Sequence, residues 1–288
     1  MIKKIIVAAF LTLPGIAFAQ KTDTTEVRVK VITQKDNTTV IVDNKNEKWI
    51  KVETPKKKAN VSWFNGVDLG FSNFTDNTDY TSAAAQAYAP GSDESWFGLR
   101  NGKSVNVNIW LVGSKINLIN NTLNLKTALG LELNNYRYES PIRYRNKSDI
   151  TAASSPGYVF WDNTAGRHYE KNKLAADYLT VPVMLNVNFL PEKKTVIKRG
   201  KTVSVRTTKE LGFSAGVSVG YLYSSRNKTI TSDEGKEKTR SGFGLNPWKL
   251  SYVGELNLGF FSLYGSYAVK SMYKNGLDMT PYTVGIRF

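Results

Sequence analysis

A single histidine, His168, is the first residue of the chain that could carry catalysis. A hydrolase or acyltransferase of the cell envelope would combine it with a serine and a carboxylate. Side chains of those two kinds fall in the same long polar stretch, at Ser148, Asp149, Ser154 and Ser155. Their spacing fixes no mutual geometry, and a loop histidine is more often simply solvated. We therefore expect no catalytic residue and a protein that is not an enzyme.

Four carboxylates on predicted strands could serve a different chemistry, that of a carboxylate protease: Asp68, Glu132, Glu210 and Glu255. Basic residues occupy the same polar faces, namely Lys126, Lys249, Lys270 and Arg287. In a confined interior opposite charges pair, because an unpaired buried charge is costly. We expect ion pairs from this group rather than acid–base catalysis.

Metal and cofactor sites have little support in the sequence. The acidic residues nearest to a cluster are Asp76, Asp79, Asp93 and Glu94, and they are too scattered for a calcium loop. The chain has no cysteine, which excludes a disulfide scaffold and a thiolate metal site. We expect no metal site and no cofactor.

The elements that would position these residues follow a targeting segment. Lys3 and Lys4 precede an apolar run over residues 5–16, which is too short to span a bilayer. Residues 17–19, Ala-Phe-Ala, fit a signal-peptidase site. The sequence therefore predicts a signal peptide over residues 1–19 and export of the mature chain.

A polar, charged extension comes next, over residues 20–60. It holds two β-like runs, at residues 26–32 and 38–42, which predict a small periplasmic hairpin or a partly ordered tether. Three lysines after Pro55 mark the boundary to one large domain over residues 61–288.

Eight segments of alternating apolar and polar residues fill that domain. They cover residues 63–71, 103–114, 122–136, 177–190, 209–223, 248–258, 261–271 and 280–288. In the third segment, for example, Leu129 and Leu131 alternate with Gly130 and Glu132. A period of two predicts strands with one apolar and one polar face. The segments at 177–190 and 209–223 are expected to continue and turn at Gly200.

The composition of the polar faces distinguishes two all-β folds. A soluble lipocalin-like barrel or sandwich would turn its polar face to water and carry many long charged side chains there. Here these positions are chiefly Gly, Ser, Asn and Thr with isolated charges, which suit the crowded lumen of a narrow barrel. The sequence therefore predicts an eight-stranded antiparallel transmembrane up-and-down β-barrel.

The connections between the segments agree with this prediction. Long polar stretches at residues 72–102, 139–176, 224–247 and 272–279 alternate with short turns near Asn120 and Gly259. Long loops outside and short turns inside are typical of outer-membrane barrels. With eight strands, both mature termini are expected in the periplasm.

The last strand carries an assembly signal. Tyr282, Val284, Ile286 and Phe288 form an apolar stripe that ends on the terminal aromatic. Other aromatics also fall at predicted strand ends, where amphipathic rings are stable at headgroup depth. We expect Phe288 and its strand to be recognised by the barrel assembly machinery.

Several of these features together resemble a known family. They are the signal sequence, Asp68-Leu69-Gly70, the Val-Pro-Val within residues 179–185, the Gly-rich segment at 209–223 and the final Ile-Arg-Phe. In this combination the chain resembles the outer-membrane β-barrel family widespread in Bacteroidetes, described as porin-like or OmpA/OmpX-like. The resemblance implies an integral protein of the outer membrane but selects no activity.

The charge balance and the resemblance together suggest partners. Lys and Arg number 39 against 24 Asp and Glu, a formal net charge of +15. Such a balance favours contact with anionic lipids, lipopolysaccharide among them, whereas nucleic acid is not expected for an exported chain. We expect a structural or surface-interaction role through the long outer loops, with an unidentified periplasmic or extracellular protein as a further partner. A small-solute porin and a lipid-modifying enzyme are the alternatives.

Overall fold

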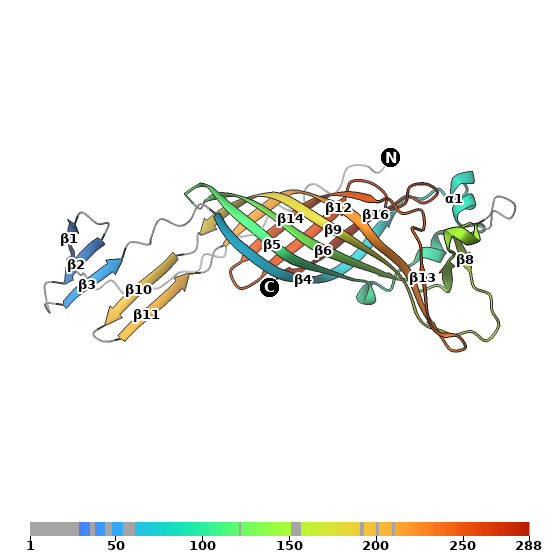
Figure 1. Ribbon diagram of the computed structural model, residues 1–288, viewed down its shortest axis with the longest axis horizontal. Coiled ribbons are helices and arrows are strands. Elements are labelled where there is room, and N and C mark those ends of the chain that lie inside the picture. Colours follow the sequence, from blue (N-terminus) through green and yellow to red (C-terminus); the bar gives the residue numbers. More distant parts are fainter. Residues whose placement is uncertain are drawn as a thin grey trace, which may run out of the picture. The chain divides into compact units, whose positions relative to one another are not determined.

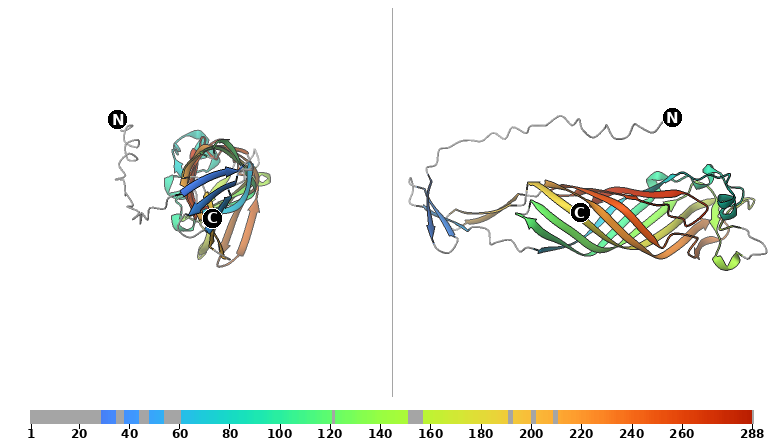
Figure 2. Two further views of the ribbon diagram at one scale, coloured as in Figure 1. Left: turned by 90° about the vertical axis from the view of Figure 1, so that its left-hand side faces the viewer. Right: turned by 90° about the horizontal axis from the view of Figure 1, so that it is seen from above.

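A ring of antiparallel strands dominates the computed structural model (Figures 1 and 2). The structure describes residues 29–34, 38–43, 48–53, 61–120, 122–150, 157–190, 193–199, 202–208 and 211–287. The ring strands are β4 (Val61–Asp76), β5 (Val105–Ile119), β6 (Leu123–Arg137), β9 (Tyr169–Leu190), β12 (Leu211–Thr231), β14 (Trp248–Leu258), β15 (Ser262–Ala268) and β16 (Met279–Arg287). Each is antiparallel to its neighbours. Because β16 pairs with β4 and β9 pairs with β12, the strands ring round.

All eight predicted segments are strands of this ring, but three of them are much longer than predicted. β4 runs on to Asp76, β9 begins at Tyr169 and β12 runs on to Thr231, so residues 72–76, 169–176 and 224–231 are strand. The prediction that these residues are loop was wrong. Residues 170–173 and 224–229 are polar on both faces, so the apolar alternation stops while the backbone ladder between β9 and β12 continues to Thr231.

Short elements occupy the long connections. β7 (Ile142–Tyr144) pairs with β8 (Val159–Trp161), and β13 (Gly235–Arg240) pairs with the far end of β12. The helical turns are α1 (Ala83–Tyr88), η1 (Glu94–Phe97), η2 (Asn101–Lys103) and η3 (Lys147–Asp149). Figure 1 places α1, β8 and β13 at one end of the ring, which we call the loop end. Within the described residues, no helix combines the length and apolarity needed to cross a membrane.

Two small sheets are separate from the ring. β1 (Val29–Gln34), β2 (Thr38–Asp43) and β3 (Lys48–Glu53) form a three-stranded antiparallel sheet. The pairing of β1 with β2 gives the expected hairpin, and β3 was not predicted. β10 (Lys193–Arg199) and β11 (Thr202–Thr208) form the pair expected on either side of Gly200. The predicted signal peptide, Gly200, Glu210, Ser154, Ser155 and Phe288 lie outside the described residues.

Burial in the ring is the reverse of that in a water-soluble domain. Over most of each strand the aliphatic side chains are exposed and the alternating polar ones are buried, whereas a few large side chains such as Trp110, Tyr178 and Tyr264 point inward. Leu69 is 50% exposed, whereas the next-door Asp68 is 0% exposed. Asn106, Asn134 and Ser214 are equally buried. The polar faces therefore point into the ring and the apolar faces point out.

Exposed aromatic residues gather toward the two ends of the outer face. One end carries Trp63, Phe189, Phe213 and Phe261, and the loop end carries Phe71, Tyr221, Tyr223, Trp248 and Tyr267. On β12 these two aromatic levels are marked by Phe213 and Tyr221. Phe213 pairs with Val187 and Tyr221 with Leu179, so eight residues separate the two levels on both β9 and β12. The outward residues between the two levels are mostly aliphatic or small, and the exposed Tyr252, opposite Val217, is an exception.

Pro182 produces one local irregularity of the ring. It lies on β9, where a missing backbone N–H removes a ladder bond. The register between β6 and β9 is interrupted between Thr127↔Val183 and Gly130↔Thr180. The Thr127 hydroxyl donates to the Pro182 carbonyl at 2.9 Å. A side-chain hydrogen bond thus joins β6 and β9 where their register is interrupted.

Candidate functional site

The interior of the ring holds a network of charges, which is the first candidate for a functional site. Arg287 on β16 binds Asp68 on β4 in a two-pronged pair, with Nε–Oδ1 at 2.6 Å and Nη2–Oδ2 at 2.8 Å. Asn108 and Trp110 donate to the same carboxylate at 3.0 and 2.8 Å. Asp68 is therefore saturated by charge-assisted hydrogen bonds.

Two further ion pairs cross the ring between strands that are not neighbours. Lys126 on β6 pairs with Glu255 on β14, and Lys249 on β14 pairs with Glu132 on β6. Arg287 also binds Glu255, which joins the two groups of charges. β6 and β14 are separated by other strands in the ring order, so these contacts reach across the interior.

Amide side chains extend the network between the charges. Asn108 receives a hydrogen bond from Asn106, which also donates to Asn134 at 2.9 Å. Asn134 in turn donates to Glu132 at 3.0 Å. The Tyr264 hydroxyl donates to Asn106 from the opposite wall. These hydrogen bonds therefore connect side chains from several strands across the interior of the ring.

The structure brings together most of the residues singled out as ion pairs, with one correction. Asp68, Glu132, Glu255, Lys126, Lys249 and Arg287 form the network, and Glu210 lies outside the described residues. Lys270 does not point into the ring: β15 ends at Ala268, two residues earlier, and Lys270 is exposed. The alternation that suggested an inward side chain stops where the strand stops.

Lys270 instead lines a cavity of about 320 Å³. The ladder between β14 and β15 ends at Ser251↔Ala268, and the cavity lies beside that end. Its lining combines outward residues such as Trp248 and Val269 with inward residues such as Tyr178 and Lys249.

Large aromatic residues close the interior at the loop end. This aromatic cap consists of buried side chains from the ring and from the loops: Tyr88, Phe97, Tyr136, Tyr138, Tyr144, Tyr178, Phe243 and Tyr273. The hydroxyls of Tyr138 and Tyr144 lie 2.6 Å apart, and those of Tyr144 and Tyr273 lie 2.9 Å apart. Burial raises the pKa of Tyr273 to about 12, so these phenols stay protonated at neutral pH.

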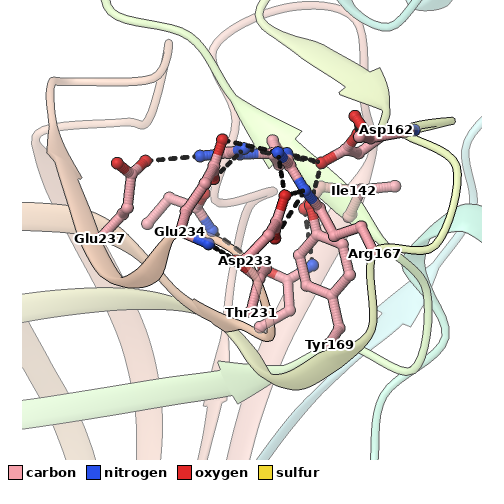
Figure 3. A network of polar contacts seen from close by, with 12 residues as sticks. Ile142, Asp162, Arg167, Tyr169, Thr231, Asp233, Glu234 and Glu237 are labelled. Atoms are coloured by element: carbon pink, nitrogen blue, oxygen red, sulfur yellow. Dashed lines mark hydrogen bonds and ion pairs between the residues drawn. The ribbon is translucent and has the colours of Figure 1, made fainter.

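A second charge network joins the loops above the cap (Figure 3). Arg167 binds Asp162 at 2.7 Å, Asp233 at 2.8 Å and Glu234 at 2.7 Å. Arg143 binds Glu234 at 2.8 Å and Glu237 at 2.6 Å. These residues, together with Tyr169, are called the loop clasp. They connect the loop that precedes β9 to the hairpin between β12 and β13.

Asp162 is the shared acceptor of the loop clasp. Burial favours its neutral form, but hydrogen bonds from Thr164, Tyr169 and Arg167 outweigh this and hold the pKa of Asp162 well below its usual range. A lowered carboxyl pKa contributes stability above its ordinary value near 4, and that stability is lost as pH falls through the folded value. The clasp should therefore stay closed at mildly acidic pH.

Replacing Asp162 with asparagine is expected to loosen the clasp without unfolding the ring. The hairpin that carries Lys236 and Lys238 should be cut faster by trypsin, because Arg143 and Arg167, which bind its acidic residues, lose the carboxylate that orients them. Mass spectrometry of the fragments measures the rate, and Asp149→Asn, in a neighbouring exposed turn, is the matched control. Equal rates for the parent and Asp162→Asn would show that the clasp does not restrain the hairpin.

The residues considered for catalysis are not assembled into a triad. His168 is exposed, and its backbone exchanges hydrogen bonds with Ser232. The Ser148 hydroxyl donates to Asp149 at 3.1 Å. Within the described residues no hydrogen bond joins His168 to either of them, and Ser154 and Ser155 lie outside those residues.

The acidic residues of the first long connection serve local turns. Asp79 accepts from Thr81, and Asp93 accepts from Ser95 ahead of η1. Asp76 accepts from the Tyr80 hydroxyl at 2.6 Å, and Glu94 lies in the first turn of η1. Across the described part of the chain, no three His, Asp or Glu side chains cluster as a metal site would require.

The aromatic cap and the loop clasp were not predicted from the sequence. The available signal was the density of aromatics in stretches assigned as polar loops, among them Tyr88, Phe97, Tyr144 and Tyr158. Large aromatic side chains that are concentrated in long connections indicate packing. The partners of Arg143 and Arg167 could not be predicted, because they depend on how two distant loops meet.

Comparison with known proteins does not assign a family. No family model and no curated protein matches the chain. A solved structure described as "Asymmetric conductivity of engineered proteins" is 8% identical, with a TM-score of 0.17 over 79% of this chain and 99% of its own. A likeness this weak carries no argument about fold or function.

Proposed function

We propose that the chain is an integral outer-membrane β-barrel protein without enzymatic activity, which presents its loop end as an interaction surface. The observation that carries the proposal is the inverted burial of the ring, with a polar interior and a broad apolar outer face. In water an apolar patch of this extent would promote aggregation. In a bilayer the lipid hydrocarbon covers such a face. The strands of transmembrane barrels alternate between apolar side chains that face the lipid and polar side chains that face the interior.

The strand pairing supports membrane insertion. A spanning sheet must leave no edge in the hydrocarbon, because an unpaired backbone group there costs several kcal/mol. The pairing of β9 with β12 and of β16 with β4 leaves each ring strand with two neighbours. The aromatic residues at both ends of the outer face fit the two interfaces. The predicted signal peptide and the family resemblance point the same way.

The filled interior favours a structural or binding role over a pore. Eight strands enclose an interior just wide enough for side chains. Here ion pairs cross it between β6 and β14, and the aromatic cap covers the loop end. The exposed position of His168 and the pairing of the interior carboxylates with basic residues favour a protein without hydrolytic or acyltransfer chemistry. Planar bilayers containing the protein should therefore show no steady conductance.

Cell fractionation and surface labelling test the proposal. The protein should appear in the outer membrane and migrate faster on a gel before heating than after it. An epitope inserted after the exposed Ser148 should be labelled in intact cells, whereas one inserted before Val61 should be labelled only after permeabilisation. The opposite labelling pattern would reverse the topology, and recovery in the soluble periplasmic fraction would refute membrane insertion.

A further inference from the structure

Basic side chains line the outward face of the ring strands where these continue past the apolar band. The register places four of them directly opposite one another on neighbouring strands. Arg137 on β6 pairs with Lys173 on β9, Lys173 pairs with Lys228 on β12, and Lys228 pairs with Lys238 on β13. Together with four neighbours they form what we call the basic face: Arg137, Lys171, Lys173, Arg226, Lys228, Lys236, Lys238 and Arg240.

These side chains share the outer side of the sheet. Directly paired residues of antiparallel strands project to the same side. The residues that alternate with them, such as Leu174, Asn227 and Thr229, are buried against the loops. The acidic Glu234 and Glu237 of the same hairpin bind Arg143 in the loop clasp. The hairpin therefore holds acidic partners in the clasp and directs its lysines outward.

Mutual repulsion on the basic face is left largely uncompensated. Like charges directly opposite each other destabilise a sheet. Burial, followed by the nearby charges of Lys171, Arg226 and Lys228, lowers the pKa of Lys173 to about 8 against an opposing effect of Asp177. The pKa of Lys228 is likewise lowered by burial, then by Lys171, Lys236 and Lys238. Asp177 is taken up by an ion pair with Arg226.

The basic face adjoins the apolar outer face along β12, whereas on β9 the outward positions between them, Ala175 and Asp177, are buried. Arg226 lies three residues beyond the exposed Tyr223, about 10 Å along β12. Below that aromatic level the same outward side carries Leu179, Val181 and Val183 on β9. A ligand that fits both regions has acyl chains next to an anionic headgroup.

We propose that the basic face binds the phosphate groups of a phosphorylated membrane lipid whose chains lie on the apolar band. The inference rests on the proposed membrane insertion. Lysine and arginine form charge-assisted hydrogen bonds with phosphate oxygens. The cationic side chains of the basic face lie opposite one another and repel. A phosphate group bound between them at the depth of the lipid headgroups reduces this repulsion. Bound lipid then contributes to holding the β9–β12–β13 extension upright on the membrane surface.

The test compares two triple variants of the full chain folded in neutral detergent. Lys173→Gln/Lys228→Gln/Lys238→Gln removes three charges from the basic face. Lys103→Gln/Lys147→Gln/Lys274→Gln removes three exposed lysines elsewhere. The probes are lipid A with its phosphates, the same lipid after dephosphorylation, and inorganic phosphate. The dissociation constant of each is measured by titration calorimetry at two salt concentrations.

The parent and the control variant should bind phosphorylated lipid A with similar affinity. The variant that lacks Lys173, Lys228 and Lys238 should bind it at least about tenfold more weakly, and its affinity should depend less on salt concentration. Without lipid, the first triple should melt no lower than the parent, because repulsion has been removed; a lower melting temperature would mark a structural role and overturn the proposal. Equal binding of the dephosphorylated lipid, or equal occupancy by inorganic phosphate alone, would also overturn it. A parent protein that is not heat-modifiable in detergent would refute the proposed membrane insertion. A heat-modifiable parent that binds phosphorylated and dephosphorylated lipid equally would refute only this inference.

Discussion

Replacing Glu255 with leucine is expected to lower the free energy of unfolding by about 3–5 kcal/mol, because it leaves buried cations without their partner. Glu255 binds both Lys126 and Arg287, and all three side chains lie inside the ring. Arg287 keeps Asp68, so the greater loss falls on Lys126. Urea titration of the protein in lipid vesicles, followed by tryptophan fluorescence, measures the change.

A matched control and a double variant separate charge from side-chain volume. Glu94→Leu makes the same replacement at an exposed position and should change the free energy of unfolding by less than about 0.5 kcal/mol. Adding Lys126→Met to Glu255→Leu should recover part of the loss, since the ammonium that loses its ion pair with Glu255 is also removed. If Glu255→Leu is as harmless as Glu94→Leu, the interior is hydrated and the ion pairs do not support the ring.

The fold was predictable from the sequence wherever apolar and polar residues alternate along a strand, because a period of two separates the two faces of the sheet. Most of β4 to β6 and β14 to β16 follows an apolar–polar alternation, interrupted in β5 by a bulge after Trp110. The Gly, Ser, Asn and Thr residues on the polar faces indicated a confined interior. The ion pairs of Asp68, Glu132 and Glu255 followed from the presence of lysines and an arginine on the same faces. These predictions depend on local sequence alone.

The loop end was not predictable in the same way. Residues 170–173 of β9 and 224–229 of β12 are polar on both faces, so alternation of hydrophobicity no longer marks the strand. The aromatic cap and the loop clasp depend on contacts between segments far apart in the chain, such as Arg143 with Glu237. The basic face appears only once the register of four strands is known, because its members are scattered from Arg137 to Arg240.

Replacing Val183 with arginine is expected to cost about 2–4 kcal/mol of unfolding free energy in a lipid bilayer, since it places a charge near the middle of the hydrocarbon. Val183 is 45% exposed on the outer face. It lies midway along β9 between Leu179, which pairs with Tyr221, and Val187, which pairs with Phe213. The two aromatic residues mark the expected membrane interfaces.

The same substitution at Leu179 is the matched control for this prediction. Leu179 is 40% exposed, nearly the same as Val183, but lies at the level of Tyr221. There a long arginine side chain reaches the headgroups, and the cost should fall to about 0–1 kcal/mol. Both variants are measured by denaturant titration in vesicles of one lipid composition. Equal costs at the two depths would contradict a bilayer around β9, because water on the outer face makes exposed positions equivalent.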